Sequence, residues 1–209
     1  MFVKQIFLSR MANFAYLVGD EATRTAAVID PSFEPDKILA EAMDAGYTIT
    51  HLINTHGHAD HVSGNAAIIE ATGAELCIHE ADADQVTKFS NRALSRLMGG
   101  KGSPKAGRLL KDNDIIAIGQ TELSVIHTPG HTPGSVCLHA DGHLFTGDTL
   151  FVGAVGRTDL AGGSMQQLLA SIHERLYTLP GDTRVWPGHD YGDSPTSTID
   201  TEKRTNPFT

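Results

Sequence analysis

Four metal-ligand side chains fall within six consecutive residues of this 209-residue chain: His56, His58, Asp60 and His61. In an extended segment, side chains two positions apart share a face, so His56, His58 and Asp60 can converge while His61 turns away. Imidazole and carboxylate ligands together favour zinc, iron or manganese over calcium or magnesium. Histidines this closely spaced repel one another when protonated unless something binds them. The segment therefore predicts a metal site.

Three further polar residues follow predicted strands, each in a turn that contains Gly or Pro. They are His131 between two Pro-Gly pairs, Asp148 after an apolar strand, and His189 after Trp186-Pro187-Gly188. Gly and Pro restrict the backbone around these side chains, so we expect each one at a sheet edge. Taken singly, each also fits an ordinary turn residue. The remaining histidines lack this spacing, and we expect them to pack or to lie on the surface: His51, His79, His127, His139, His143 and His173.

Alternating strands and helices must position these residues. β-Branched and aromatic residues between Gly, Pro and Asp turns predict strands over 3–8, 14–18, 26–29, 50–54, 75–78, 114–118, 122–127, 135–139, 143–146 and 184–186. Apolar stripes of helical period predict helices over 35–45, 64–72 and 165–178. Two β-rich halves with helices suit two sheets packed face to face with helices outside.

Two segments have weaker patterns. Residues 80–106 hold scattered charges and a Gly-rich stretch, which predict a helix followed by a mobile loop, a candidate lid over a site. Residues 190–209 are expected to be mostly irregular.

Composition narrows the class of protein. The net charge of −9 argues against a nucleic-acid or anionic-membrane surface, because either would need a basic patch. Cys77 and Cys137 lie in apolar stretches and are expected to be buried, reduced thiols. The first residues lack the pattern of a signal peptide, and no apolar run reaches the length of a membrane span. We therefore expect a soluble cytoplasmic protein.

The metal-ligand motif and the three later residues, in this order, resemble the metallo-β-lactamase superfamily over nearly the whole chain. Segments 147–151, 187–191 and 202–208 resemble its glyoxalase II (hydroxyacylglutathione hydrolase) branch. The resemblance implies an α/β fold, an αββα four-layer sandwich with a dinuclear metal centre at one sheet edge. It also implies a single domain over 1–209, without the full C-terminal helical extension of glyoxalase II.

The resemblance assigns a role to each residue of the motif. It implies a first metal bound by His56, His58 and His131, a second bound by Asp60, His61 and His189, and a bridging carboxylate from Asp148. Two divalent ions, zinc above all with iron or manganese as alternatives, would leave open positions for water. A hydroxide between them, oriented by Asp60, would attack a small-molecule thioester such as an S-acylglutathione.

The substrate contacts are less closely matched. By resemblance, Arg157 and Tyr191 contact the thiol carrier, although Arg157 can instead pair with Asp159 or Asp148. Asp159 stands about where glutathione-binding relatives carry an aromatic residue.

Other reactions remain open at this stage. The sister branch of persulfide dioxygenases, with one iron on residues matching His56, His131 and Asp148, is the main alternative. Other hydrolases of the superfamily, or a metal-stabilised protein without activity, are further alternatives. The oligomeric state is left open.

Overall fold

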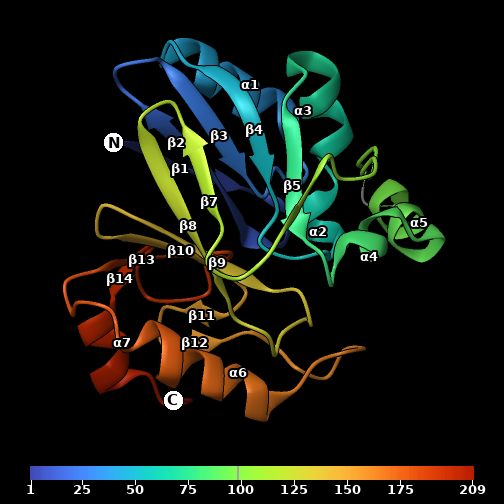
Figure 1. Ribbon diagram of the computed structural model, residues 1–209. Helices are drawn as coiled ribbons and strands as arrows, with labels where there is room; N and C mark the ends of the chain where they lie inside the picture. Colours follow the sequence, from blue (N-terminus) through green and yellow to red (C-terminus); the bar gives the residue numbers. More distant parts are fainter. Residues whose placement is uncertain (98) are drawn as a thin grey trace.

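The computed structural model of the protein describes residues 1–97 and 99–209. Two six-stranded sheets pack face to face, and helices cover the outer face of each sheet (Figure 1). This arrangement is the αββα four-layer sandwich that the sequence predicts, so the fold prediction is confirmed.

The first sheet has its strands in chain order, with β1 to β3 antiparallel and β3 to β6 parallel. Its strands are β1 Phe2–Leu8, β2 Asn13–Asp20, β3 Thr25–Ile29, β4 Thr48–Ile53, β5 Glu75–His79 and β6 Arg108–Leu110. The connection from β3 to β4 runs through the outer helix α1 Pro35–Asp44, and that from β4 to β5 through the outer helix α3 Asn65–Thr72. A 3-10 turn, Arg10–Ala12, and a single helical turn, α2 Ala59–Val62, lie at the sheet edge that carries the metal-ligand motif.

The second sheet has the strand order β14-β13-β10-β9-β8-β7. Its strands are β7 Ile115–Ile118, β8 Thr121–His127, β9 Val136–Ala140, β10 His143–Gly147, β13 Arg184–Pro187 and β14 Ser197–Thr198. A small hairpin, β11 Leu150–Phe151 and β12 Ala154–Val155, follows β10. The outer layer consists of α6 Met165–Ser171, its π-helical continuation Ile172–Leu176, and α7 Ile199–Thr205.

Strand β2 shows how the layers are joined. All eight of its residues are buried, because alternate side chains point to opposite faces of the sheet. Phe14, Tyr16 and Val18 belong to the core between the sheets. Ala15 and Leu17 belong to the core under the outer helices. A third apolar cluster joins the second sheet to α6, its continuation and α7.

Most predicted strands and helices are confirmed to within a few residues. Residues 190–209 are not mostly irregular as predicted, since they contain β14 and α7. Helix α7 begins at Ile199 because the Thr198 hydroxyl accepts a hydrogen bond from the amide of Thr201, at 3.2 Å. Strands β6, β11, β12 and β14 were not predicted, and none of them exceeds three residues.

The 80–106 segment contains two short helices, α4 Ala83–Thr87 and α5 Phe89–Leu97, rather than one. The loop after α5 is hydrogen-bonded to the layer beneath it. The Lys101 amide donates to Ser63 O (3.2 Å), and Ala66 N donates to Gly102 O (3.1 Å). Met98, which falls in this predicted helix and loop segment, lies outside the described residues.

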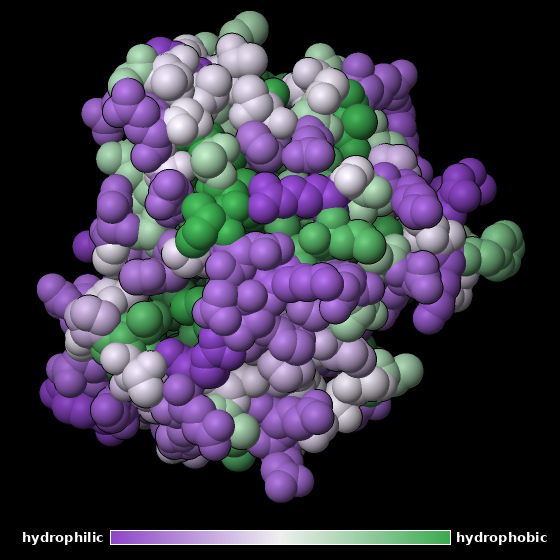
Figure 2. Space-filling model, in the orientation of Figure 1, coloured by the Kyte–Doolittle hydropathy of each residue, from purple (hydrophilic) through white to green (hydrophobic). Residues whose placement is uncertain are grey.

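Both cysteines lie in the core, as the sequence predicts. Cys77 and Cys137 are both buried free thiols. Figure 2 shows mostly polar side chains on one face, with apolar side chains gathered mainly across its middle. None of the described helices is long and apolar enough to cross a membrane.

Candidate metal centre and pocket

One edge of the sandwich brings together all seven residues that the sequence predicts as metal ligands. The loop after β4 carries His56 and His58, and the helical turn α2 carries Asp60 and His61. The turns after β8, β10 and β13 supply the other three, which are His131, Asp148 and His189.

The motif itself is not extended throughout, so the prediction that His61 turns away from the other three is wrong. His58 has extended backbone angles and is the residue before α2, which begins at Ala59. The helical turn directs the side chains of Asp60 and His61 toward each other, with His61 Nε2 3.4 Å from Asp60 Oδ2.

Three imidazoles form the first cluster of candidate ligand atoms. His58 Nδ1 lies 2.9 Å from His131 Nε2, which lies 3.2 Å from His56 Nε2. One donor atom from each side chain falls within 4.8 Å of the other two. Such convergence of imidazole nitrogens suits a cation that accepts all three lone pairs.

The second cluster combines two imidazoles with a carboxylate. His61 Nε2 lies 3.2 Å from His189 Nε2. Asp60 Oδ2 lies 3.4 Å from His61 Nε2 and 3.5 Å from His189 Nε2. These donor atoms are also within 4.8 Å of one another.

The Asp148 carboxylate lies between the two clusters. Its Oδ2 is 3.5 Å from His131 Nε2 and 3.4 Å from His189 Nε2, whereas its Oδ1 is 3.3 Å from His61 Nε2. Oδ1 is buried and, apart from the ion-pair contact with His61, has no hydrogen-bond partner among the described residues. A buried carboxylate oxygen is costly to leave without a partner, so the site favours a cation beside it.

Hydrogen bonds outside the clusters fix which imidazole nitrogen faces inward. His131 Nδ1 lies 2.7 Å from Arg157 O, and His189 Nδ1 lies 2.9 Å from Met11 O. Carbonyl oxygens only accept, so both Nδ1 atoms carry the proton and donate. The Nε2 lone pairs are therefore directed into the clusters, as metal ligation requires.

The sequence reasoning missed Asp30, which plays the same part for His61. Asp30 Oδ2 accepts a hydrogen bond from His61 Nδ1 at 3.0 Å and one from the Thr55 hydroxyl at 2.6 Å. Its Oδ1 accepts from the Thr55 amide at 2.8 Å. The available signal was its position directly after the buried strand β3, at the edge where β4 also ends.

The sequence reasoning also missed Asp82, a fully buried carboxylate that joins the two loops of the first cluster. It accepts hydrogen bonds from the amide of Gly57 (2.8 Å), the amide of Gly134 (2.9 Å) and the hydroxyl of Thr132 (2.7 Å). Nothing in its sequence surroundings distinguishes it from a surface acid.

The glycine before His189 has a steric function. A Cβ atom at Gly188 would lie 2.4 Å from Asp148 Oδ1. The Pro-Gly-His turn therefore brings the backbone against the Asp148 carboxylate at a distance that no side chain allows.

The two clusters differ in charge. Burial and the nearby His131 lower the pKa of His58 to about 4, so this imidazole is neutral at pH 7. Burial raises the pKa of Asp60, but His61 outweighs it and lowers the pKa to about 2. Burial lowers the pKa of His61, but Asp148, Asp60 and Asp30 together raise it well above its usual value. Without metal, a proton on His61 therefore compensates the carboxylates of the second cluster.

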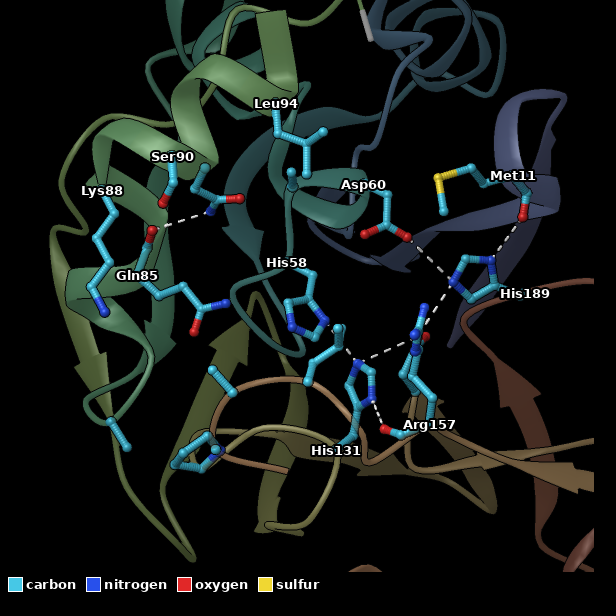
Figure 3. A pocket seen from close by; sticks show the side chains of 18 of the residues that line it. Met11, His58, Asp60, Gln85, Lys88, Ser90, Leu94, His131, Arg157 and His189 are labelled. Atoms are coloured by element: carbon cyan, nitrogen blue, oxygen red, sulfur yellow. Dashed lines mark hydrogen bonds and ion pairs between the residues drawn. The ribbon is translucent and has the colours of Figure 1, made fainter. Parts of the chain in front are cut away.

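A cavity of about 1130 Å³ opens onto both clusters. Helices α4 and α5 form one of its walls, and the segments around Met11 and Arg157 form the opposite side (Figure 3). The predicted lid segment thus contributes a wall of the pocket.

The two predicted substrate contacts, Arg157 and Tyr191, both line this cavity. The Arg157 guanidinium is paired with Asp159 through two contacts of 2.7 Å, which is one of the alternatives the sequence left open. The Tyr191 ring stacks on His189 with centroids 4.6 Å apart and remains 55% exposed.

Comparison with known proteins identifies the family. The sequence model of the metallo-beta-lactamase superfamily matches residues 9–189. The chain belongs to the metallo-beta-lactamase superfamily. The seven residues of the two clusters all lie within the matched range.

Individual members of the superfamily carry different names. A hydroxyacylglutathione hydrolase of Polaromonas sp. (strain JS666 / ATCC BAA-500) is 42% identical over 183 residues, which are 86% of this chain and 62% of that protein. The mitochondrial persulfide dioxygenase ETHE1 of Homo sapiens is 33% identical over 98% of this chain and 74% of its own length. The crystal structure of the BLEG-1 B3 metallo-beta-lactamase superposes with a TM-score of 0.89 at 33% identity, covering 99% of both chains. These relatives resemble the chain to a similar degree, but their names refer to different reactions.

Proposed function

We propose that the protein is a metal-dependent hydrolase that cleaves a thioester, such as an S-acylglutathione. The observation that carries this proposal is the buried Asp148 carboxylate between two complete clusters of ligand atoms. Chemistry at a pair of metal ions activates water for attack on a carbonyl, and a thiolate leaves with little need for a proton. The hydroxyacylglutathione hydrolase relative at 42% identity supports the same reaction class.

The donor set fits two divalent cations, with zinc the first choice and iron or manganese as alternatives. The first would be held by His56, His58 and His131, the second by Asp60, His61 and His189, and Asp148 would contact both. The Nδ1 hydrogen bonds described above leave the Nε2 lone pairs free for this role.

Bound ions would supply an acidified water and polarise the substrate carbonyl. The chain's own residues then orient the reactants. Asp60 lines the cavity, so its carboxylate would help to hold a metal ion and could accept a hydrogen bond from a water molecule in the cavity. Asp148 also lines the cavity, and its carboxylate lies between the two clusters and maintains their spacing. Tyr191 extends the wall beside His189 and can contact the bound substrate.

A mononuclear persulfide dioxygenase is the second candidate. The observation that favours it is a set of two imidazoles and one carboxylate within the larger site. His131 Nε2 lies 3.2 Å from His56 Nε2 and 3.5 Å from Asp148 Oδ2, which suits a single iron with open positions. The ETHE1 relative also matches over 98% of this chain.

Metal analysis together with two assays separates these candidates. We expect about two metal ions per purified chain and release of free thiol from S-D-lactoylglutathione. Glutathione persulfide with an oxygen electrode, and a chromogenic β-lactam, are the comparison substrates. One iron per chain with rapid oxygen consumption would contradict the hydrolase proposal and support the dioxygenase. Faster hydrolysis of the β-lactam than of the thioester would contradict the thioesterase proposal.

A further inference from the structure

The wall of the pocket formed by α4 and α5 carries polar side chains that the metal centre does not use. Lys88, Gln85 and Ser90 line the cavity and come from the same wall (Figure 3). Across the residues that the structure describes, the Lys88 ammonium, the Gln85 side-chain amide and the Ser90 hydroxyl make no hydrogen bond or ion pair. A cation, an amide and a hydroxyl are thus all available to a ligand.

The only other Lys or Arg among the described lining residues is already engaged. Arg157 forms a bidentate pair with Asp159, with Nε 2.7 Å from Oδ1 and an Nη 2.7 Å from Oδ2. The paired Asp159 carboxylate compensates the charge of this guanidinium and repels an anionic ligand, whereas no carboxylate of the described residues is paired with Lys88. Figure 3 shows Lys88 and Arg157 on opposite sides of His58 and His131.

The α4–α5 wall is fixed relative to the metal-ligand loop. Asn91 Nδ2 donates hydrogen bonds to Gly57 O at 2.8 Å and to Gln85 O at 3.1 Å. Gly57 lies between the two first histidines of the motif, and its amide is held by Asp82. A group bound at Lys88 therefore has a defined position relative to the reaction centre, which lowers the entropic cost of aligning a flexible substrate.

We propose that Lys88, with Gln85 and Ser90, binds the carboxylate end of the thiol carrier of the substrate. This inference rests on the proposed thioesterase function and deepens it. The substrate class is then an acyl thioester of a flexible thiol that carries a carboxylate and amide groups. The carboxylate contacts the Lys88 ammonium, and the carrier's amides contact Gln85 and Ser90. Thioesters of neutral thiols lack the charged contact and bind more weakly.

A substitution of Asp84 should change the affinity for an anionic carrier in the opposite direction to a substitution of Lys88. It lies four residues before Lys88 and also lines the cavity, and no ion pair joins the two in the described structure. Its carboxylate repels the anion that Lys88 attracts. Lys88→Gln should therefore weaken the binding of an anionic carrier, and Asp84→Asn should strengthen it.

The experiment compares charged and neutral carriers on the metal-loaded enzyme. KM and kcat are measured with S-D-lactoylglutathione and with the lactoyl thioester of N-acetylcysteamine, which is neutral. The Kd of S-methylglutathione, a thioether that is not hydrolysed, is measured by calorimetry. The control is Lys105→Gln, which removes an exposed lysine outside the described pocket lining.

We expect Lys88→Gln to raise KM and Kd for the glutathione compounds by up to about fivefold, as for an exposed ion pair, with kcat little changed. KM for the neutral thioester should stay the same, and Lys105→Gln should behave as wild type. The Lys88 effect should shrink at high salt, because ions screen exposed charges.

The failures of the two proposals are distinguishable. If wild-type enzyme hydrolyses S-D-lactoylglutathione and Lys88→Gln has unchanged KM and Kd, the Lys88 site is refuted while the thioesterase stands. If no thioester is hydrolysed, the thioesterase is refuted, and the Kd of S-methylglutathione still decides the Lys88 site. If S-methylglutathione does not bind, or if Lys88→Gln does not change its Kd, the proposed Lys88 site is refuted.

Discussion

Replacing Asp30 by asparagine should weaken the second metal cluster while leaving the first nearly intact. Asp30 does not face the cavity, but its carboxylate accepts hydrogen bonds from His61 Nδ1 and from the amide and hydroxyl of Thr55. Its φ of 50° lies in the left-handed region, which asparagine tolerates better than most residues. Asp30→Asn therefore changes the acceptors without straining the backbone.

The magnitude follows from the number of acceptors. The carboxylate satisfies three donors with two oxygens, but the amide has one oxygen. If the amide oxygen faces His61, its NH₂ group meets the Thr55 amide, donor against donor. If it faces the Thr55 amide, His61 must move its proton to Nε2, where the proton blocks the lone pair needed by a metal. One hydrogen bond to a charged group is lost either way, about 1.5–3 kcal/mol, which corresponds to roughly 10- to 100-fold in metal affinity.

A chelator titration measures this effect directly. Wild type and Asp30→Asn are loaded with zinc and titrated with a coloured chelator, and the zinc retained per chain is followed with thioesterase activity. Asp20→Asn is the matched control, because Asp20 is also buried and accepts three backbone amides, but away from the metal-ligand loops. One zinc ion should dissociate 10- to 100-fold more readily, and the other as in wild type. Two ions retained as in wild type, or both lost equally, would refute the reasoning.

Four further predictions concern the same centre. Asp148→Ala should abolish activity and lower the metal content measured by mass spectrometry, because the carboxylate reaches both clusters; full activity would contradict this. Gly188→Ala should reduce activity at least tenfold through the 2.4 Å clash with Asp148 Oδ1, with kcat as the readout and wild-type kcat as the contrary result. Asp159→Asn should free Arg157 and lower KM for anionic thioesters up to about fivefold, as expected for an exposed pair; an unchanged KM means that Arg157 does not reach the substrate. The acids around His61 raise the pKa of this imidazole, and metal binding should displace its proton. Metal affinity should therefore rise with pH at values below this raised pKa. Calorimetry in two buffers of different ionisation enthalpy should detect the released proton, and equal heats in both buffers would contradict the prediction.

The strand pattern predicted two sheets packed face to face, and the motif together with the turn residues predicted the seven side chains that the structure brings together; the αββα sandwich and the grouping of the ligands came from the family resemblance. The strands are long enough for their period to be visible, and each distal ligand stands directly after a strand in a Gly or Pro turn. The grouping of ligands could not be derived from spacing alone. Helix α2 spans four residues, about one turn, so no periodicity distinguishes it from an extended segment, and the expected direction of His61 was wrong.

Buried supporting residues were harder to predict than ligands. Asp30 and Asp82 carry no motif, and acids after strands or in charged segments are common in turns. Their partners are backbone amides and side chains from loops far apart in the sequence, such as Gly134 for Asp82. Only the packing of the two sheets brings these groups into contact.

The metal-ligand loops and the α4–α5 wall of the pocket come from different parts of the chain, and this separation explains why the motif identifies the superfamily but not the reaction. Asp30 and Asp82 hold the ligand loops from inside the sandwich. The α4–α5 wall presents exposed side chains that can change without disturbing a ligand. Relatives named as a hydrolase and as a dioxygenase can thus resemble the chain at 42% and 33% identity. Two variants test the metal centre and the pocket wall separately. Asp30→Asn weakens one metal cluster and shows how many ions the reaction needs, whereas Lys88→Gln leaves the centre unchanged and shows which carrier the pocket binds.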